Sequence, residues 1–76
     1  MNIYVMNTRT PDDIGIETPM VSTDINELRY EMKRLYDETL AENEGWIEDC
    51  YIEDSTAHVS TNDNEVFEWL ITAHKI

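Results

Sequence analysis

Apolar residues follow a strand-like pattern near the N-terminus of the chain. Residues 2–6 form a short apolar run rich in β-forming residues, which predicts a first strand. Residues 7–14 contain Thr-Pro-Asp-Asp and indicate a loop. Residues 15–22 alternate loosely and predict an additional short strand, which Pro19 would restrict to a sheet edge.

A helical spacing follows and predicts a helix over about residues 24–43. Asp24 is a typical N-cap, and Glu27 three residues later completes a pair resembling a capping box. Gly45 stands where a left-handed residue is expected after the helix. The positions that recur at helical spacing, and that we expect to face the core, are Ile25, Leu28, Met32, Leu35 and either Thr39 or Leu40.

The rest of the chain predicts a hairpin and a second helix. Residues 46–54 and 57–61 have the composition of two strands joined by a tight connection at Ser55 and Thr56. Asn62-Asp63-Asn64-Glu65 repeats the capping pattern and predicts a final helix. This helix would pack through Val66, Phe67, Trp69, Leu70 and Ile71.

These elements predict an α+β fold with the order β-(β)-α-β-β-α. We expect a small antiparallel sheet of about three strands with two helices on one face or at one end. The 76 residues are enough for one domain, and we assign residues 1–76 to a single acidic α+β domain.

The net charge and its uneven distribution along the chain indicate which partners the protein can bind. The net charge is −12, from 17 acidic and five basic residues. Residues 1–34 hold six acids and four bases, whereas residues 35–76 hold 11 acids and one base, so the second part carries −10. Nucleic acid and anionic membranes are therefore poor direct partners, and basic protein surfaces are favourable ones.

The same features suggest a location. The single cysteine, Cys50, cannot form an internal disulfide and fits a reducing compartment. The first residues lack the basic and apolar regions of a signal peptide, and no stretch approaches the length of a membrane span. We expect a cytoplasmic protein, in the host cytoplasm if a phage encodes it.

Candidate catalytic and metal-binding residues are few. His58, His74 and Cys50 share no metal-ligand spacing, and we expect a structural role for each, with Cys50 in the core and His74 in the last turn of a helix. The calcium interpretation of Asp54 and residues 62–65 fails because no glycine follows Gly45. We expect no catalytic residue, no metal and no cofactor; a metal-stabilised module is a third hypothesis.

The acidic residues are the main functional candidates. They fall on predicted helices and strands, where clustered like charges cost stability, and residues 35–74 contain no Lys or Arg. Rigid carboxylates can imitate the regularly spaced phosphates of DNA. The predicted partner contacts are Glu38, Glu42, Glu44, Glu48, Asp49, Glu53, Asp54, Asp63, Glu65 and Glu68.

Several short motifs are similar to a known family. The order of Ile3-Tyr4-Val5, "DINELRYEM", "CYIEDST" and "NDNEVFEWL" resembles the N-terminal domain of ArdA-type antirestriction proteins, with Ile52 and Asp54 matching the family's I-x-D. The family consists of acidic mimics of B-form DNA from mobile elements, which occupy the DNA groove of type I restriction enzymes. In size and charge the chain also resembles phage anti-CRISPR proteins.

Two functional hypotheses follow. The first is a non-catalytic inhibitor of a host anti-phage defence nuclease, from a restriction or a CRISPR system, acting as a DNA mimic on a basic nucleic-acid-binding surface. The alternative is a small acidic adaptor or assembly protein that binds a protein partner through an aromatic patch around Tyr36, Trp46 or Trp69. Taken one by one, Tyr30, Tyr36, Trp46 and Trp69 are first expected to pack in the core.

Overall fold

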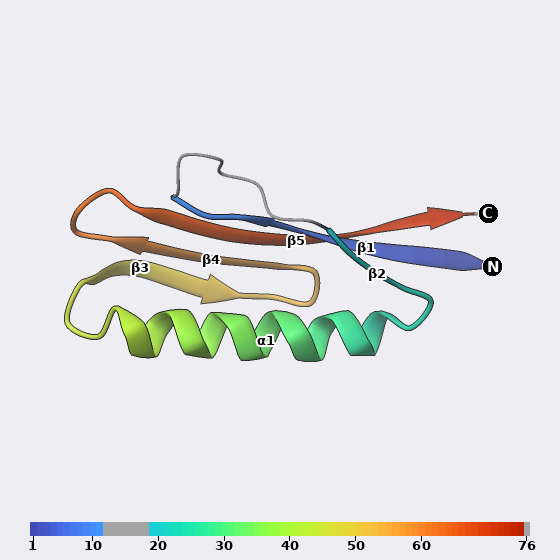
Figure 1. Cartoon of the computed structure of the whole chain (residues 1–76), viewed down its shortest axis with the longest axis horizontal. Helices are drawn as coiled ribbons and strands as arrows, with labels where there is room; N and C mark the ends of the chain where they lie inside the picture. Colours follow the sequence, from blue (N-terminus) through green and yellow to red (C-terminus); the bar gives the residue numbers. More distant parts are fainter. Residues whose placement is uncertain (12–18, 76) are drawn as a thin grey trace.

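A computed structural model describes residues 1–11 and 19–75, and over these residues the chain forms five strands and one helix (Figure 1). The single helix packs along a sheet whose strands run roughly parallel to it. The elements are β1 (Asn2–Arg9), β2 (Met20–Ser22), α1 (Ile25–Glu42), β3 (Ile47–Ile52), β4 (Thr56–Thr61) and β5 (Val66–Lys75).

The sheet is antiparallel throughout, with the strand order β2-β1-β5-β4-β3. The longest ladder joins the first and last strands, from Asn2 opposite Lys75 to Arg9 opposite Glu68. The short β2 and the acidic β3 are the two edges. Both chain ends therefore lie at the same end of the molecule, as Figure 1 shows.

The predicted helix over about residues 24–43 is confirmed, since α1 runs from Ile25 to Glu42 with Asp24 as its N-cap and Asn43 as its C-cap. The Asp24 carboxylate accepts a hydrogen bond from the Asn26 backbone N–H at 2.9 Å. The predicted capping box does not form, because the Glu27 carboxylate accepts instead from the Ser22 hydroxyl at 3.2 Å. Gly45 has φ +87°, the left-handed conformation predicted for this position.

The core lies between α1 and one face of the sheet. Alternate residues of the central strands point toward the helix, among them Met6 on β1, Val59 on β4 and Trp69 on β5. The Tyr36 and Trp69 rings meet edge to face, with centroids 6.5 Å apart. The buried apolar residues are Met6, Leu28, Met32, Tyr36, Ala57, Val59, Trp69 and Ile71.

The predicted second helix is wrong, because residues 66–75 form the central strand β5. Their apolar residues alternate in burial between Phe67, Trp69 and Ile71 on the helix-facing side and Leu70 on the other side. β-Branched and aromatic residues dominate this segment and favour a strand. His74, predicted in a final helical turn, is exposed on β5, and its Nε2 lies 3.0 Å from the Thr72 hydroxyl.

The predicted fold class is wrong in consequence, since the sheet has five strands rather than about three and the described residues contain one helix rather than two. The β3–β4 hairpin and the edge position of β2 are confirmed. The predicted strand over residues 15–22 is described only for Met20–Ser22. Residues 15–18 lie outside the described residues.

Three residues expected in the core are on the surface. Trp46 is 56% exposed and Tyr30 is 70% exposed. Trp46 precedes β3 in the loop that leaves α1, and Tyr30 is on the solvent side of the helix. Cys50 is exposed on the edge strand β3. Among the tryptophans, only Trp69 stabilises the core.

The two tryptophans should therefore respond differently to truncation. Trp69→Ala removes a side chain that is 3% exposed and should lower the free energy of unfolding by about 3–5 kcal/mol. Trp46→Ala should lower it by only about 0.5 kcal/mol, because a surface side chain leaves no cavity. Urea denaturation followed by circular dichroism measures both values. Equal losses in the two variants would contradict this assignment of the core.

Tyr36 should make the fold sensitive to alkaline pH. Burial, with a smaller effect of the Cys50 thiol, raises the pKa of the Tyr36 hydroxyl from 10.0 to about 12. The stabilisation that depends on the neutral phenol is complete below pH 10 and is lost as pH rises toward 12. Urea denaturation at pH 8, 10 and 11 should show a steeper decline for the wild type than for Tyr36→Phe, and parallel declines would refute the prediction.

Candidate functional site

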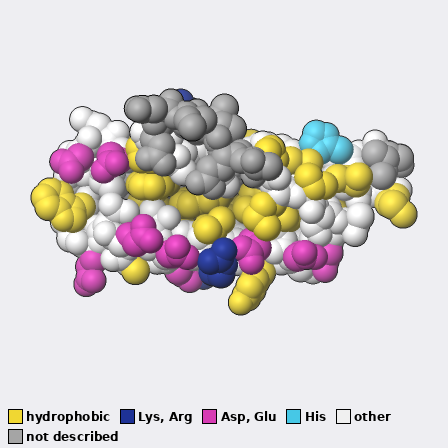
Figure 2. Space-filling view, in the orientation of Figure 1, with side chains coloured by type: hydrophobic (Ala, Val, Ile, Leu, Met, Phe, Trp, Pro, Cys, Tyr) yellow, Lys and Arg dark blue, Asp and Glu magenta, His cyan; other side chains and the backbone are white. Residues whose placement is uncertain are grey.

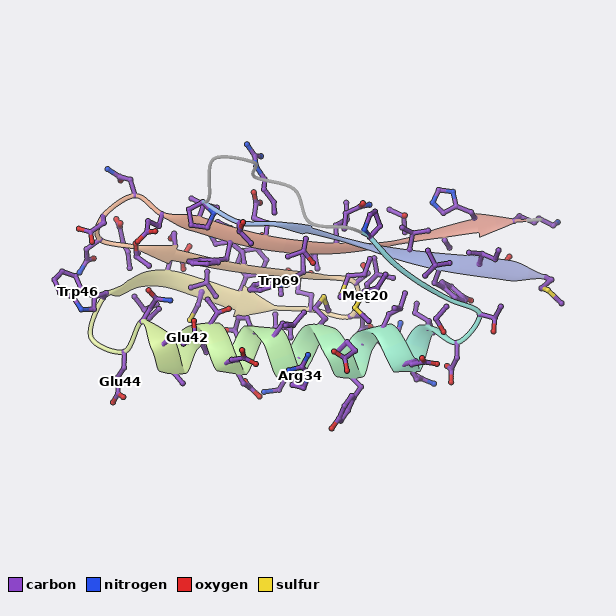
Figure 3. The ribbon with its side chains drawn as sticks, viewed as in Figure 1. Met20, Arg34, Glu42, Glu44, Trp46 and Trp69 are labelled. Atoms are coloured by element: carbon purple, nitrogen blue, oxygen red, sulfur yellow. The ribbon has the colours of Figure 1, made fainter. Side chains whose placement is uncertain are left out.

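Four of the ten predicted contact residues meet at one end of the molecule. Glu42 ends α1 and Glu44 lies in the loop after it, while Asp63 and Glu65 lie in the turn between β4 and β5. Figure 3 shows Glu42, Glu44 and Trp46 at this end, opposite the chain termini. We call residues 42–46 and 62–65 the acidic end.

Backbone hydrogen bonds join the two segments of the acidic end. The Trp46 N–H donates to the Asn43 carbonyl at 2.9 Å, which closes the loop that Gly45 turns with its positive φ. The Asn62 N–H donates to the Trp46 carbonyl at 2.9 Å and ties this loop to the β4–β5 turn. Hydrogen bonds therefore hold the backbone from which the carboxylates at this end project.

The conformation of Asn64 and two hydrogen bonds to Thr61 form the β4–β5 turn. Asn64 adopts φ +65°, a conformation that Asn tolerates better than most residues, and its N–H donates to the Thr61 carbonyl at 3.0 Å. The buried Thr61 hydroxyl accepts from the Glu65 N–H at 3.3 Å. The Asn and Asp residues that suggested a helix cap thus build a hairpin turn, with Asp63 and Glu65 exposed on it.

Glu48 and Asp49 lie on the edge strand β3, where the pairing with β4 is irregular between Ile47 and Asp49. Charged side chains and irregular pairing on an edge strand prevent it from adding further strands. The fold alone therefore explains these two carboxylates, and neither needs a partner to account for its position.

Glu53 and Asp54 lie in the exposed turn between β3 and β4, away from the acidic end. Arg29 of α1 donates from Nε to the Asp54 backbone carbonyl at 3.0 Å. This bond fixes the turn against the helix and leaves the Asp54 carboxylate exposed.

The last two predicted contacts have cationic neighbours. Glu38 lies 3.1 Å from Arg34, which also binds Glu31 at 2.8 Å. Glu68 lies on the sheet face opposite the helix, 3.8 Å from Arg9 and 3.7 Å from His58. Exposed pairs of this kind contribute little to stability, but they reduce the negative charge offered to a partner.

The basic residues of α1 form ion pairs with acidic residues of the same helix or a hydrogen bond with the β3–β4 turn. Lys33 binds Asp37 at 2.7 Å, Arg34 binds Glu31 and Glu38, and Arg29 holds the turn. Within residues 1–11 and 19–75, the other eight predicted contacts have no Lys, Arg or His at salt-bridge distance. These eight are Glu42, Glu44, Glu48, Asp49, Glu53, Asp54, Asp63 and Glu65.

The ten acids do not form one continuous face. The acidic end holds four of them, and the remainder occupy the edge strand, the β3–β4 turn, the helix and the open sheet face. In the view of Figure 2, acidic side chains are spread along the helix side and also occur at the end opposite the termini, with few basic atoms among them. Their functional role remains a prediction.

Sequence reasoning missed Trp46 as a surface residue. The signal was present in the sequence, because Gly45 indicates a tight turn immediately after the helix, and a residue in such a turn has little core to enter. The other proposed aromatic anchors, Tyr36 and Trp69, are 7% and 3% exposed and pack on each other. They are unavailable for docking.

Other kinds of site are sparse in the described residues. A hollow of about 330 Å³ lies beside Asn7–Arg9 and Glu68–Leu70, and its charged groups are the already paired Arg9 and Glu68. No group of three or more His, Cys, Asp or Glu could hold a metal ion within the described ranges. No helix in the described part of the chain is long and apolar enough to cross a membrane.

No protein-family model, curated protein or solved structure matches the chain. The resemblance to ArdA-type proteins therefore stays a hypothesis that depends on the short motifs quoted above.

Screening of the acids should stabilise the fold. Raising NaCl from about 0.02 to 0.3 M shortens the Debye length severalfold, which weakens repulsion among many carboxylates more than it weakens a few exposed ion pairs. The melting temperature should rise with salt in the wild type. It should rise less when Glu42, Glu44 and Glu65 are changed to Gln and Asp63 to Asn. A melting temperature that is flat or falls in the wild type would contradict the prediction.

Proposed function

We propose that the protein is a non-catalytic inhibitor that binds the basic nucleic-acid-binding surface of another protein and excludes DNA from it. The observation that carries the proposal is the set of eight exposed carboxylates that have no cationic neighbour among the described residues. Such groups keep their full charge for a partner, and their attraction to a basic groove speeds and orients association.

The charge density is compatible with occupation of a DNA groove. The long axis measures 42 Å and the net charge is −12, which averages one charge per about 3.5 Å (42/12), about half the linear density of duplex DNA, which carries one charge per ~1.7 Å of axis. The other two axes measure 23 and 14 Å, so the molecule is a flattened rod. A groove that holds a duplex has room for a body of this width.

The rigidity of the frame supports the same proposal. The carboxylates stand on a helix, an edge strand and three hydrogen-bonded connections, so a partner would order few of them on binding. Preorganised groups lose less entropy in a complex than groups on a disordered tail. The resemblance to antirestriction proteins and the anti-CRISPR-like size suggest a restriction or CRISPR nuclease as the target.

A second candidate is an acidic adaptor that binds through Trp46. The observation in its favour is the exposure of this large aromatic side chain. Salt separates the two functions, because an aromatic contact is nearly insensitive to salt, whereas a charged contact weakens as salt rises.

Competition with DNA tests the proposal. A type I restriction enzyme and a CRISPR effector, each carrying a fluorescent duplex, would be titrated with the protein at two NaCl concentrations. The protein should displace the duplex from its target, and displacement should weaken steeply as salt rises because both ligands occupy the same basic surface. A partner that binds the protein equally well with saturating DNA present would refute mimicry and favour the adaptor.

Charge reversal locates the contacts. Changing Glu48, Asp49, Glu53 and Asp54 together to Lys should abolish displacement while circular dichroism stays unchanged, since all four are exposed. The matched variant changes Glu42, Glu44, Asp63 and Glu65 of the acidic end to Lys and should also abolish displacement, since the proposal depends on all eight carboxylates. Wild-type displacement by both folded variants would show that the carboxylates are only solvated surface.

A further inference from the structure

The face of the sheet that points away from α1 carries exposed apolar side chains. Within the described residues, the one helix packs on the face that holds Met6, Val59 and Trp69, and the strand register places the alternate residues on the opposite face. We call this opposite face the open sheet face. On it, Val21 is 62% and Leu70 is 49% exposed. Its apolar residues are Ile3, Val5, Val21, Tyr51, Val66 and Leu70.

The open sheet face carries little net charge. Its paired strand residues include two acids, Asp49 and Glu68, and one base, Arg9, which gives −1, whereas the whole chain carries −12. Glu68 lies 3.8 Å from Arg9 and 3.7 Å from His58, so its charge has cationic neighbours. A basic partner is attracted to the acids elsewhere on the molecule. A second copy of this acidic chain, by contrast, meets the least repulsion at the open sheet face.

The open sheet face is large enough for a specific interface. One strand residue occupies about 3.4 by 4.8 Å of a sheet, so the five strands present about 540 Å² as a flat area. Two such faces bury about 1,100 Å² together, above the ~1,000 Å² that a specific interface needs. Packed sheets interdigitate their side chains, which would remove Val21 and Leu70 from water.

We propose that a second copy of the chain covers the open sheet face and forms a twofold dimer, with the two sheets in the middle and the two α1 helices outside. The strands of two packed sheets lie within about 30° of each other. Figure 1 shows that the strands of one chain run along its long axis, so the long axes of the two copies are roughly aligned. The acids of α1 and of the acidic end stay exposed in this arrangement.

The dimer also supplies charge density that one chain lacks. One chain has about half of the linear charge density of duplex DNA. Two aligned copies carry −24 (2 × −12) over the same 42 Å, which averages one charge per about 1.75 Å (42/24), against ~1.7 Å for the duplex. This second part of the inference, that the dimer is the form that occupies a DNA-binding surface, rests on the proposed function.

Sedimentation equilibrium of the full chain from micromolar to millimolar concentration tests the dimer. The wild type should reach twice the mass of one chain. Raising NaCl from about 0.02 to 0.3 M should lower the dimer dissociation constant severalfold, because screening weakens the repulsion between two acidic copies. In methyl NMR spectra, the signals of Leu70 and Val21 should shift on dilution while those of the buried Leu28 stay in place.

Matched substitutions locate the interface. Leu70→Glu and Val21→Glu should each raise the dissociation constant about tenfold or more, because a charge is then buried between the copies. Tyr30→Glu and Trp46→Glu place the same charge at residues that are 70% and 56% exposed away from the open sheet face, and should leave the dissociation constant nearly unchanged. All four positions are exposed, and circular dichroism verifies that each variant is folded.

The outcomes separate the dimer from the proposed function. A wild type that is monomeric at every concentration, or Leu70→Glu and Val21→Glu variants as dimeric as Tyr30→Glu, would overturn the dimer even if DNA is displaced from the target. Loss of the dimer in the first two variants alone would support it even if competition with DNA fails. A monomeric wild type that needs Leu70 to bind a different protein would assign the face to that protein and would also overturn the second copy.

The role of the dimer in mimicry has its own readout. A folded, monomeric Leu70→Glu variant should displace duplex DNA from the target severalfold less well than Tyr30→Glu, although the two variants carry the same charge. Equal displacement by the two variants would overturn this role and leave the dimer itself in place.

Discussion

The pairing of β1 with β5 is the constraint on which the rest of the structure depends. It joins the two ends of the chain over the whole length of β1 and places Met6 opposite Ile71 and Thr8 opposite Trp69. The face that this ladder presents is the one that α1 covers, so the core exists only when the first and last strands are together. The β3–β4 hairpin completes the sheet from one side, because β4 pairs with β5.

The protein carries many more acidic residues than its five basic residues can neutralise. The basic residues of α1 bind acids of the same helix or the β3–β4 turn, so they do little for the acidic end. The charges on β3 protect an open sheet edge, which gives them a use within the fold. The carboxylates of the acidic end have no comparable structural explanation, and the exposed Trp46 lies at the same end of the molecule. These observations make that end the strongest candidate for a binding surface.

Sequence patterns predicted the local elements better than their assembly. The helix was predictable because Asp24, Gly45 and a regular apolar stripe agree on its range. The strand over residues 66–75 was not predictable in this way, because Asn62 to Glu65 suits a helix cap and a hairpin turn equally well. Whether the segment after it forms a helix or a strand depends on pairing with β1, which is distant in sequence. The acids were visible in the sequence, but only the fold separates those on an edge strand from those at the acidic end. Trp46 was predicted to be buried because hydrophobicity alone favours burial, but the turn after the helix leaves its side chain exposed.

The central position of β5 also has a consequence for how the protein folds as it is synthesised. The β3–β4 hairpin and α1 involve only neighbouring residues, so both can form while the chain is still emerging from the ribosome. The β1–β5 ladder, by contrast, connects residues 59 to 73 positions apart, from the pair Arg9 and Glu68 to the pair Asn2 and Lys75. Until β5 emerges, β1 has an unpaired edge and Met6 has no sheet neighbour on that side. The nascent chain therefore waits in a partly formed state, and its dense negative charge then opposes aggregation with other chains.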